Sequence, residues 1–171
     1  GEHHISLLDL AASLRGPTPH PLDCEGESVS GTTFPNGCHV AEVEIDPATG
    51  VSDVISYHAV DDLGFVVSPQ LVQGQVHGGV LQGAGQVFGE HAIYDADSAQ
   101  LLTGSFMDYV MPRVGWVPHI HTDYHLVPTK LNALGAKGVG ESGCSGSLPA
   151  LVNAMSDALR RAGVPPLAMP F

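Results

Sequence analysis

The sequence predicts an α+β fold, a mixed sheet with packed helices, and three patterns in the chain support this prediction. Residues 39–46 and 51–60 alternate apolar and polar side chains on either side of a turn, as the two strands of a β-hairpin do. Residues 70–89 carry apolar side chains at helical spacing. A second helical pattern, over residues 151–159, keeps its apolar side chains on one face. At 171 residues, the chain is long enough for about one such domain.

The N-terminal part of the chain is expected to hold one short helix and a long extended segment. Residues 5–14 have apolar side chains at helical spacing, with Ser6 near the start. Residues 16–37 contain four prolines and four glycines with little periodicity, which favours a loop. The sequence therefore predicts an N-terminal helix and linker over residues 1–33 and a domain over residues 34–171.

The helix expected at residues 70–89 is unusually rich in glycine. Ser68 and Pro69 provide an N-cap and a first helical residue. Six glycines follow within the helix, and each interior glycine costs roughly 0.5–1 kcal/mol relative to alanine. Such a cost indicates a compensating gain, so we expect this helix to pack very closely against a sheet or a cofactor.

Two more elements are expected towards the C-terminus. Residues 119–127 alternate enough to form another strand. The last helix is expected to begin at Ser145 or Ser147 as N-cap, with Pro149 in its first turn, and to end at Gly163.

Composition limits the possible partners. The formal net charge of −12, with only six Lys and Arg, argues against nucleic acid, because phosphate binding needs clustered basic side chains. No apolar run approaches the ~18 residues of a membrane span. The three cysteines fall in no CxxC spacing, which indicates a reducing, cytoplasmic compartment. We therefore expect small molecules or proteins as partners, with no nucleic acid and no membrane.

A glycine-dense loop over residues 134–146 presents Lys137 and Glu141 four residues apart. Glycine removes side chains, so this backbone can approach something large and flat or anionic very closely. One interpretation makes Glu141 a general base beside a cofactor, with its pKa set by burial and by Lys137. The alternative is a solvated surface charge or a helix cap.

Three other motifs have weaker support. Residues 138–143 match GxGxxG, but a helix starting after the motif and the short remaining chain argue against a dinucleotide site. His119, His121 and His125 could share a strand face and bind a metal, although an exposed strand explains them equally well. Cys144 at a helix start could be a thiolate, but without a placed histidine partner we favour a small buried cysteine.

Three blocks together resemble the C-terminal part of the large subunit of the molybdenum hydroxylases, the xanthine dehydrogenase, aldehyde oxidase and carbon monoxide dehydrogenase family. They are GQVHGGVLQGAGQVFGE (74–90), DYVMPRVGWVP (108–118) and GAKGVGES (135–142). Their order and separations agree with the family, and the resemblance extends from about Phe34 to the C-terminus. It implies the fold of the family's C-terminal molybdopterin-binding domain.

The resemblance also implies a site. In the family mechanism, Glu141 would be the general base that removes a proton so that water-derived oxygen is added to an aldehyde or N-heterocycle. Gln75 would lie near the molybdenum centre. The cofactor-binding residues that the resemblance implies are Gly74, Gln75, Lys137, Val139 and Gly140. No metal ligand is expected from the side chains of this chain.

The implied cofactor is molybdopterin with molybdenum, in its cytosine dinucleotide form, and its phosphates suit backbone N–H groups in glycine-rich turns. Iron–sulfur clusters and FAD are expected on partner subunits, because three isolated cysteines do not suit a cluster. The family's large subunit is several times longer than this chain. We therefore expect part of an oxidoreductase that joins other portions of the molybdenum subunit and is inactive alone.

Two alternatives belong to other classes of protein. One is a non-catalytic fragment or interaction module that keeps the fold without the cofactor. The other is a thiol enzyme that uses Cys144.

Overall fold

The structure is a computed structural model and describes residues 4–16, 18–29 and 31–171. The chain divides into two compact units, Gly1–Ser30 and Gly31–Phe171. The domain boundary that the sequence predicts, between residues 33 and 34, stays a prediction.

The first unit contains α1 (Leu7–Ser13). Its N-cap is Ser6, whose hydroxyl oxygen accepts a hydrogen bond of 3.1 Å from the backbone N–H of Asp9. The short N-terminal helix that the sequence predicts is therefore confirmed.

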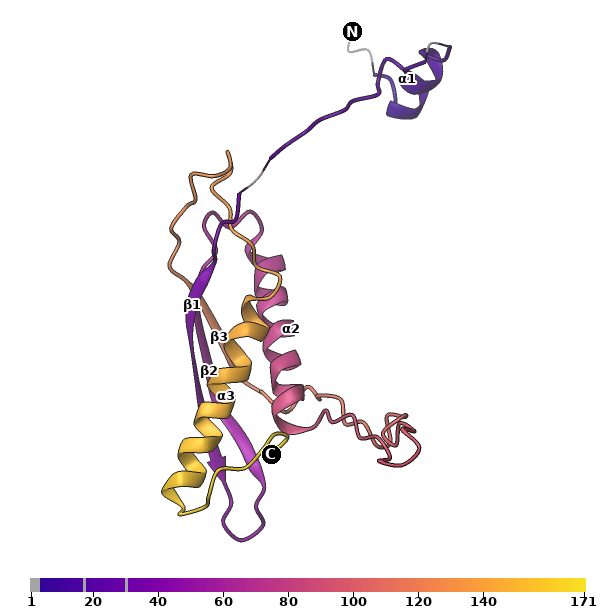
Figure 1. Cartoon of the computed structure of the whole chain (residues 1–171). Helices are drawn as coiled ribbons and strands as arrows, with labels where there is room; N and C mark the ends of the chain where they lie inside the picture. The colour runs from indigo at the N-terminus through magenta and orange to yellow at the C-terminus, as the bar shows by residue number, and fades with distance from the viewer. Residues whose placement is uncertain (1–3, 17, 30) are drawn as a thin grey trace. The chain divides into compact units, whose positions relative to one another are not determined.

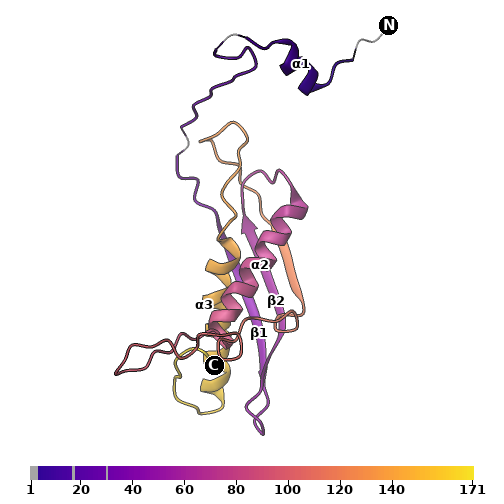
Figure 2. The ribbon, with the colours of Figure 1, turned by 90° about the vertical axis from the view of Figure 1, so that its right-hand side faces the viewer.

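The second unit is a sheet with two helices on one face (Figures 1 and 2). The strands β1 (Asn36–Ile45), β2 (Ser52–Asp62) and β3 (Ile120–Tyr124) lie in the order β1-β2-β3. β1 pairs antiparallel with β2, whereas β3 pairs parallel with it, so the sheet is mixed. The helices α2 (Pro69–Phe88) and α3 (Ser142–Arg161) lie side by side on it. The predicted α+β fold is confirmed.

The β-hairpin that the sequence predicts is present. β1 and β2 pair from Asn36 opposite Asp62 to Ile45 opposite Ser52, with an irregularity between Glu42 and Val43. A bulge of this kind adds local twist to a strand. The inward side chains of both strands contribute to a core that the two helices cover. The buried cluster consists of Val54, Tyr57, Ala59, Val76, Val80, Ala84, Val87, Val117 and Leu151.

The glycines of α2 allow α3 to approach closely. A Cβ atom on Gly79 would lie 2.8 Å from the backbone nitrogen of Cys144, and one on Gly83 would lie 2.0 Å from Ser147 Oγ. The close packing that we expected of this helix is therefore present. For these two glycines the partner is α3, not a sheet or a cofactor.

α3 begins earlier than the sequence predicts. Its first residue is Ser142 and its N-cap is Glu141, so neither Ser145 nor Ser147 caps it and Pro149 lies inside the helix. The reason is tertiary packing, because a Cβ on Gly143 in the first turn would lie 2.4 Å from the Val76 carbonyl oxygen. Contact with α2 at this short range outweighs the local cap signals.

The C-terminal end of α3 agrees with the prediction. The helix ends at Arg161, with Ala162 as C-cap, and Gly163 follows with a φ of 76°. Within the described ranges, no helix is long and apolar enough to cross a membrane.

Candidate functional site

The glycine-rich loop before α3 is tied to α2 by the side chain of Gln75. The amide Nε2 of Gln75 donates a hydrogen bond of 2.9 Å to the carbonyl oxygen of Gly140. These residues are far apart in the sequence, and both were expected near the cofactor. The structure therefore brings Gly74 and Gln75 of α2 next to the GVGE segment of the loop, residues 138–141.

The other end of the loop is held by Lys137. Its Nζ lies 2.5 Å from Oδ2 of Asp62, and the two side chains are only 10% and 9% exposed. Lys137 is therefore paired with Asp62, and not with Glu141 as we expected. The Lys137 side chain is so little exposed that it offers little surface to a cofactor.

Asp62 is the most extensively bonded carboxylate in this region. Its Oδ1 accepts hydrogen bonds from the backbone N–H groups of Gly64 at 3.0 Å and Val127 at 2.9 Å. Burial alone would raise the pKa of Asp62, but hydrogen bonds from Lys137 and from these two N–H groups, with the ammonium charge, lower it to about 2. The carboxylate thus joins the end of β2 to two later segments of the chain.

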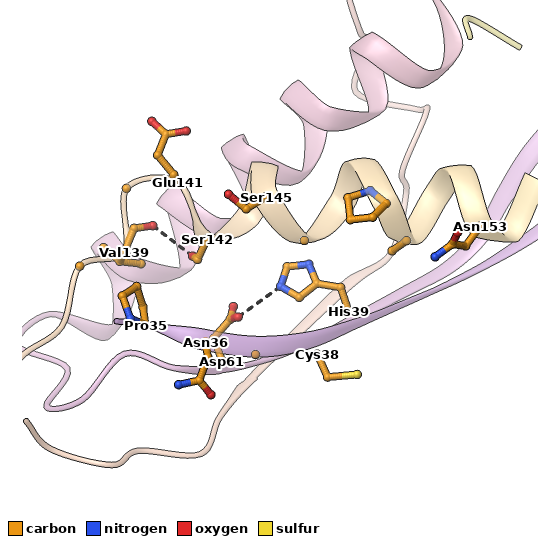
Figure 3. Close-up of a pocket in the computed structure, with 16 residues that line it drawn as sticks. Pro35, Asn36, Cys38, His39, Asp61, Val139, Glu141, Ser142, Ser145 and Asn153 are labelled. Carbon is orange, nitrogen blue, oxygen red and sulfur yellow. Dashed lines mark hydrogen bonds and ion pairs between the residues drawn. The ribbon is translucent and has the colours of Figure 1, made fainter. Parts of the chain in front are cut away.

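Glu141 lies at the surface, at the N-cap of α3. Its side chain makes no capping hydrogen bond and is exposed. Figure 3 shows it pointing away from His39 and Asp61, which face each other between β1 and α3. Glu141 is therefore not buried within the chain, contrary to our expectation. The side chain accepts no hydrogen bond from the backbone N–H groups of the first turn of α3, and it faces outwards.

Four glycines near Gln75 are not explained by packing within the chain. A Cβ atom on Gly74, Gly78, Gly138 or Gly140 would meet nothing within 4 Å, and none of the four has the positive φ that favours glycine. At these glycines the backbone is not covered by side chains, and it lies near the exposed amide side chain of Gln75. Such a surface suits the close approach of a flat group with phosphates, so the residues present fit molybdopterin.

Val139 anchors the middle of the loop. Its half-buried side chain packs against the hydrophobic core, and its carbonyl oxygen accepts a hydrogen bond of 3.1 Å from Ser142 Oγ. The loop is thus fixed by one apolar contact while Gly138 and Gly140 on either side stay exposed.

A pocket of about 720 Å³ lies between the start of β1, the loop and the first half of α3 (Figure 3). His39 and Asp61 line it, and each side chain is only 4% exposed. His39 Nε2 lies 3.2 Å from Asp61 Oδ1, and Nδ1 lies 2.6 Å from the hydroxyl oxygen of Tyr57. Burial, and then the charge of Asp61, raises the pKa of Tyr57 above its ordinary value.

The sequence alone assigns no role to His39, Tyr57 and Asp61. A signal was available, because His39 shares the inward phase of β1 with Ala41 and Val43. A polar side chain on an otherwise apolar face of a strand needs a buried partner.

The thiolate interpretation of Cys144 is not supported. Burial, and then the negative charge of Glu141, raises the pKa of the Cys144 thiol.

The metal-site interpretation of His119, His121 and His125 is not supported either. His121 stacks on His58, with ring centroids 4.6 Å apart. In the part of the chain that the structure describes, no group of three or more His, Cys, Asp or Glu could hold a metal ion.

The GxGxxG match fails in a different way from the one expected. α3 begins at Ser142, inside residues 138–143, and not after them. However, the described segment before the match forms only an isolated bridge, between Gly64 and Ala136, and no strand. A dinucleotide fingerprint follows a strand directly, so the match has no such context.

Comparison with known families identifies one that covers more than half of the chain. The family described as molybdopterin cofactor-binding domain matches residues 11–118. The match includes Gly74 and Gln75 and begins before Phe34, where we expected the resemblance to start. It ends before the loop that carries Glu141.

Individual relatives extend the similarity. The large chain of carbon monoxide dehydrogenase from Hydrogenophaga pseudoflava is 38% identical over 138 residues, which is 81% of this chain and 17% of the relative. The nicotine 6-hydroxylase large subunit of Paenarthrobacter nicotinovorans is 39% identical over 166 residues, which is 92% of this chain and 20% of the relative. That second match extends past residue 118 and across the loop.

Solved structures agree with the sequence comparison. The crystal structure of quinoline 2-oxidoreductase from Pseudomonas putida 86 matches with a TM-score of 0.76 and 40% identity, over 80% of this chain and 17% of that one. The chain thus spans about one fifth of the length of these relatives.

Proposed function

Because the chain belongs to the molybdopterin cofactor-binding domain family of the molybdenum hydroxylases, we propose that it forms one wall of a molybdopterin site and supplies Glu141 as general base. The reaction is the hydroxylation of an aldehyde or an N-heterocycle with oxygen from water. The observation that carries the proposal is the hydrogen bond from Gln75 to Gly140. This bond joins the start of α2, with the unobstructed Gly74, to the unobstructed Gly140, which directly precedes the exposed Glu141.

The proposed cofactor contacts follow from what this surface leaves free. Gln75 uses its Nε2 on the loop, and its Oε1 can accept a hydrogen bond from the cofactor. At Gly74 and Gly140, the absence of a side chain lets the cofactor approach the backbone. Val139 packs against the core and so fixes the distance between the loop and the core. When bound, molybdopterin supplies a molybdenum centre that takes up the electrons of the reaction.

Glu141 suits a general base by its position. Its carboxylate is exposed and makes no capping hydrogen bond, so both oxygens can accept a proton from a group placed outside the chain. A base must come within about 2.6–3.2 Å of the proton donor. The fixed ends of the loop hold Glu141 where such contact requires no rearrangement of the core.

The proposed partners are the other portions of the molybdenum subunit, together with iron–sulfur and flavin subunits. The relatives that support this proposal are named as large chains or large subunits, and this chain spans about a fifth of each. We further propose the cytosine dinucleotide form of the cofactor and a cytoplasmic complex. Three free cysteines, Cys24, Cys38 and Cys144, support a reducing compartment.

The test is an assembled complex. The chain is co-expressed with the rest of the large subunit and with the partner subunits, and molybdenum, CMP content and turnover are measured. Glu141→Gln should keep molybdenum while turnover falls by at least about a hundredfold, the usual contribution of a general base. The matched control is Glu44→Gln, an exposed carboxylate on β1. Full turnover in Glu141→Gln would refute the base, and a complex without molybdenum would support the non-catalytic alternative.

Gln75 needs a separate comparison. Gln75→Ala should lower the molybdenum content of the purified complex, because the substitution removes a cofactor contact and one tether of the loop. Gln82→Ala removes a similar exposed amide from the same helix and should leave the content unchanged. Equal loss in both variants would assign the effect to α2 as a whole, and no loss in either would remove Gln75 from the site.

A further inference from the structure

The segment that carries Glu141 depends on its two ends for its position. Within the described residues, the backbone N–H groups of residues 138–141 donate no hydrogen bond to the chain. Gly138 and Gly140 add no side-chain packing. Only Val139 contacts the core. On the C-terminal side, the bond from Gln75 and the start of α3 hold the segment, because the Ser145 N–H donates a hydrogen bond of 2.9 Å to the Glu141 carbonyl oxygen. On the N-terminal side, the position of the segment depends on the attachment at Lys137.

The attachment at Lys137 is the more extensive one. Besides the ion pair with Asp62, the backbone N–H of Lys137 donates a hydrogen bond of 2.9 Å to the Leu63 carbonyl oxygen. The glycines at this junction are required, because a Cβ on Gly64 would lie 2.3 Å from the carbonyl oxygen of Gly135. The main chain thus brings Lys137 to the end of β2, and the buried ion pair closes the junction.

We propose that Asp62 and Lys137 are positioning residues that hold the loop carrying Glu141, and that Lys137 does not contact the cofactor. The side chain of Lys137 is 10% exposed and its charge is paired with Asp62, so it serves the loop. Only the consequence for catalysis rests on the proposed function. The holding of the loop is a property of this chain alone.

The substitution Asp62→Asn isolates the ion pair. An asparagine keeps Oδ1, which still accepts from the backbone N–H groups of Gly64 and Val127. It loses the charge that binds Lys137. Lys137→Met removes the other partner, while Lys137→Arg keeps the positive charge. The controls are Asp53→Asn, on an exposed part of β2, and Lys130→Met, at an exposed site before the loop.

The experiment measures backbone ¹⁵N order parameters in the whole chain. In the wild type we expect values near 0.85 for residues 138–141, and below about 0.6 in Asp62→Asn and Lys137→Met. The values of β2 should stay constant, which separates release of the loop from general unfolding. Lys137→Arg should restore most of the order, and both controls should match the wild type. Unchanged values in Asp62→Asn, or a loop already mobile in the wild type, would overturn the proposal. If Asp62→Asn does not fold, Lys137→Met against Lys137→Arg decides the question.

The assembled complex separates this inference from the proposed function. If both are correct, Asp62→Asn lowers kcat while KM and molybdenum content stay at the wild-type level. If the order parameters change but Glu141→Gln remains active, the positioning stands and the proposed base is wrong. If Glu141→Gln is inactive and the order parameters do not change, the base stands and the positioning is wrong.

Discussion

Two carboxylates near the glycine-rich loop have opposite surroundings. Asp62 is buried and bonded by an ammonium group and two backbone N–H groups, whereas Glu141 is exposed and makes no capping bond. A carboxylate that is bonded in this way is locked in its ionised form and serves structure. An exposed one is free to exchange protons with a bound group. At the scale of single residues, Asp62 therefore suits the positioning role that we propose for it, and Glu141 suits the proposed role of general base.

The bonding of Asp62 predicts a specific acid sensitivity. Its pKa is about 2 in the folded chain, against an ordinary value of 3.8. The unfolded chain therefore binds more protons in this range, so stability rises with pH. The contribution is complete above pH about 4 and is lost as the pH falls through about 2. The free energy of unfolding of the wild type should fall more steeply over this interval than that of Asp62→Asn.

Urea unfolding followed by circular dichroism, from pH 2 to pH 7, measures this slope. Asp53→Asn is the control, because Asp53 is exposed on the same strand, and it should retain the wild-type slope. Parallel curves for the wild type and Asp62→Asn would show that the carboxylate titrates alike in the folded and unfolded chains.

Cys144 predicts a second residue-scale result. Burial and the nearby charge of Glu141 raise the pKa of its thiol, so less thiolate is present at neutral pH than for an ordinary cysteine. Cys24 and Cys38 are exposed. Iodoacetamide at pH 7 should therefore label these two first, as peptide mass spectrometry can record. Faster labelling of Cys144 would return the thiol-enzyme alternative to consideration.

The sequence could indicate which residues belong to this site, but not which of them contact one another. The motif placed Gln75 and Glu141 in the same functional region, and the structure brings Gln75 onto Gly140 next to Glu141. The spacing of Lys137 and Glu141 suggested contact, yet residues four apart face each other only on a helix. Here Lys137 lies in a loop, and its partner is Asp62, at the end of β2. A contact between distant segments leaves no local pattern in a single sequence.

At the scale of elements, four of the five glycines of α2 form two kinds, and the fifth, Gly85, lies against Glu90 and Pro112. Gly79 and Gly83 lie where α3 comes too close for any side chain, while Gly74 and Gly78 face open space. The sequence predicted a compensating gain for six helical glycines but could not separate these faces. The start of α3 was missed for a related reason, because close packing of Gly143 against α2 fixes it.

The two kinds of glycine predict opposite effects of a glycine-to-alanine substitution on the free energy of unfolding. Gly83→Ala places a Cβ 2.0 Å from Ser147 Oγ and should lower the free energy of unfolding by about 1–3 kcal/mol, the usual cost of overpacking. Gly78→Ala meets nothing within 4 Å and should raise it by about 0.5–1 kcal/mol through helix propensity. Urea titration of both variants beside the wild type measures the difference. A loss of stability in Gly78→Ala would show that the exposed face of α2 is already packed in the chain.

At the scale of the whole molecule, the second unit exposes much apolar surface. The segment that follows α2 extends away from the sheet and helices and then returns to the core at Trp116 and Val117 (Figures 1 and 2). In it, the side chains of Phe106, Met107 and Val114 are 83%, 90% and 91% exposed. Apolar side chains gathered on an extended segment are typical of a surface that another polypeptide covers. Relatives about five times longer than this chain have the additional polypeptide to cover it.

The exposed segment therefore predicts how the isolated chain behaves. Phe106→Ser and Met107→Ser together should reduce the binding of an apolar dye such as ANS and reduce self-association in analytical ultracentrifugation. The thermal midpoint should stay the same, because neither residue belongs to the buried cluster. In co-expression with the rest of the large subunit, the same pair should weaken recovery of the complex. The control, Val80→Ser in the core, should lower the midpoint instead. If the surface pair lowers the midpoint as much as the core substitution, the segment packs on the sheet and helices and is not a contact for the rest of the subunit.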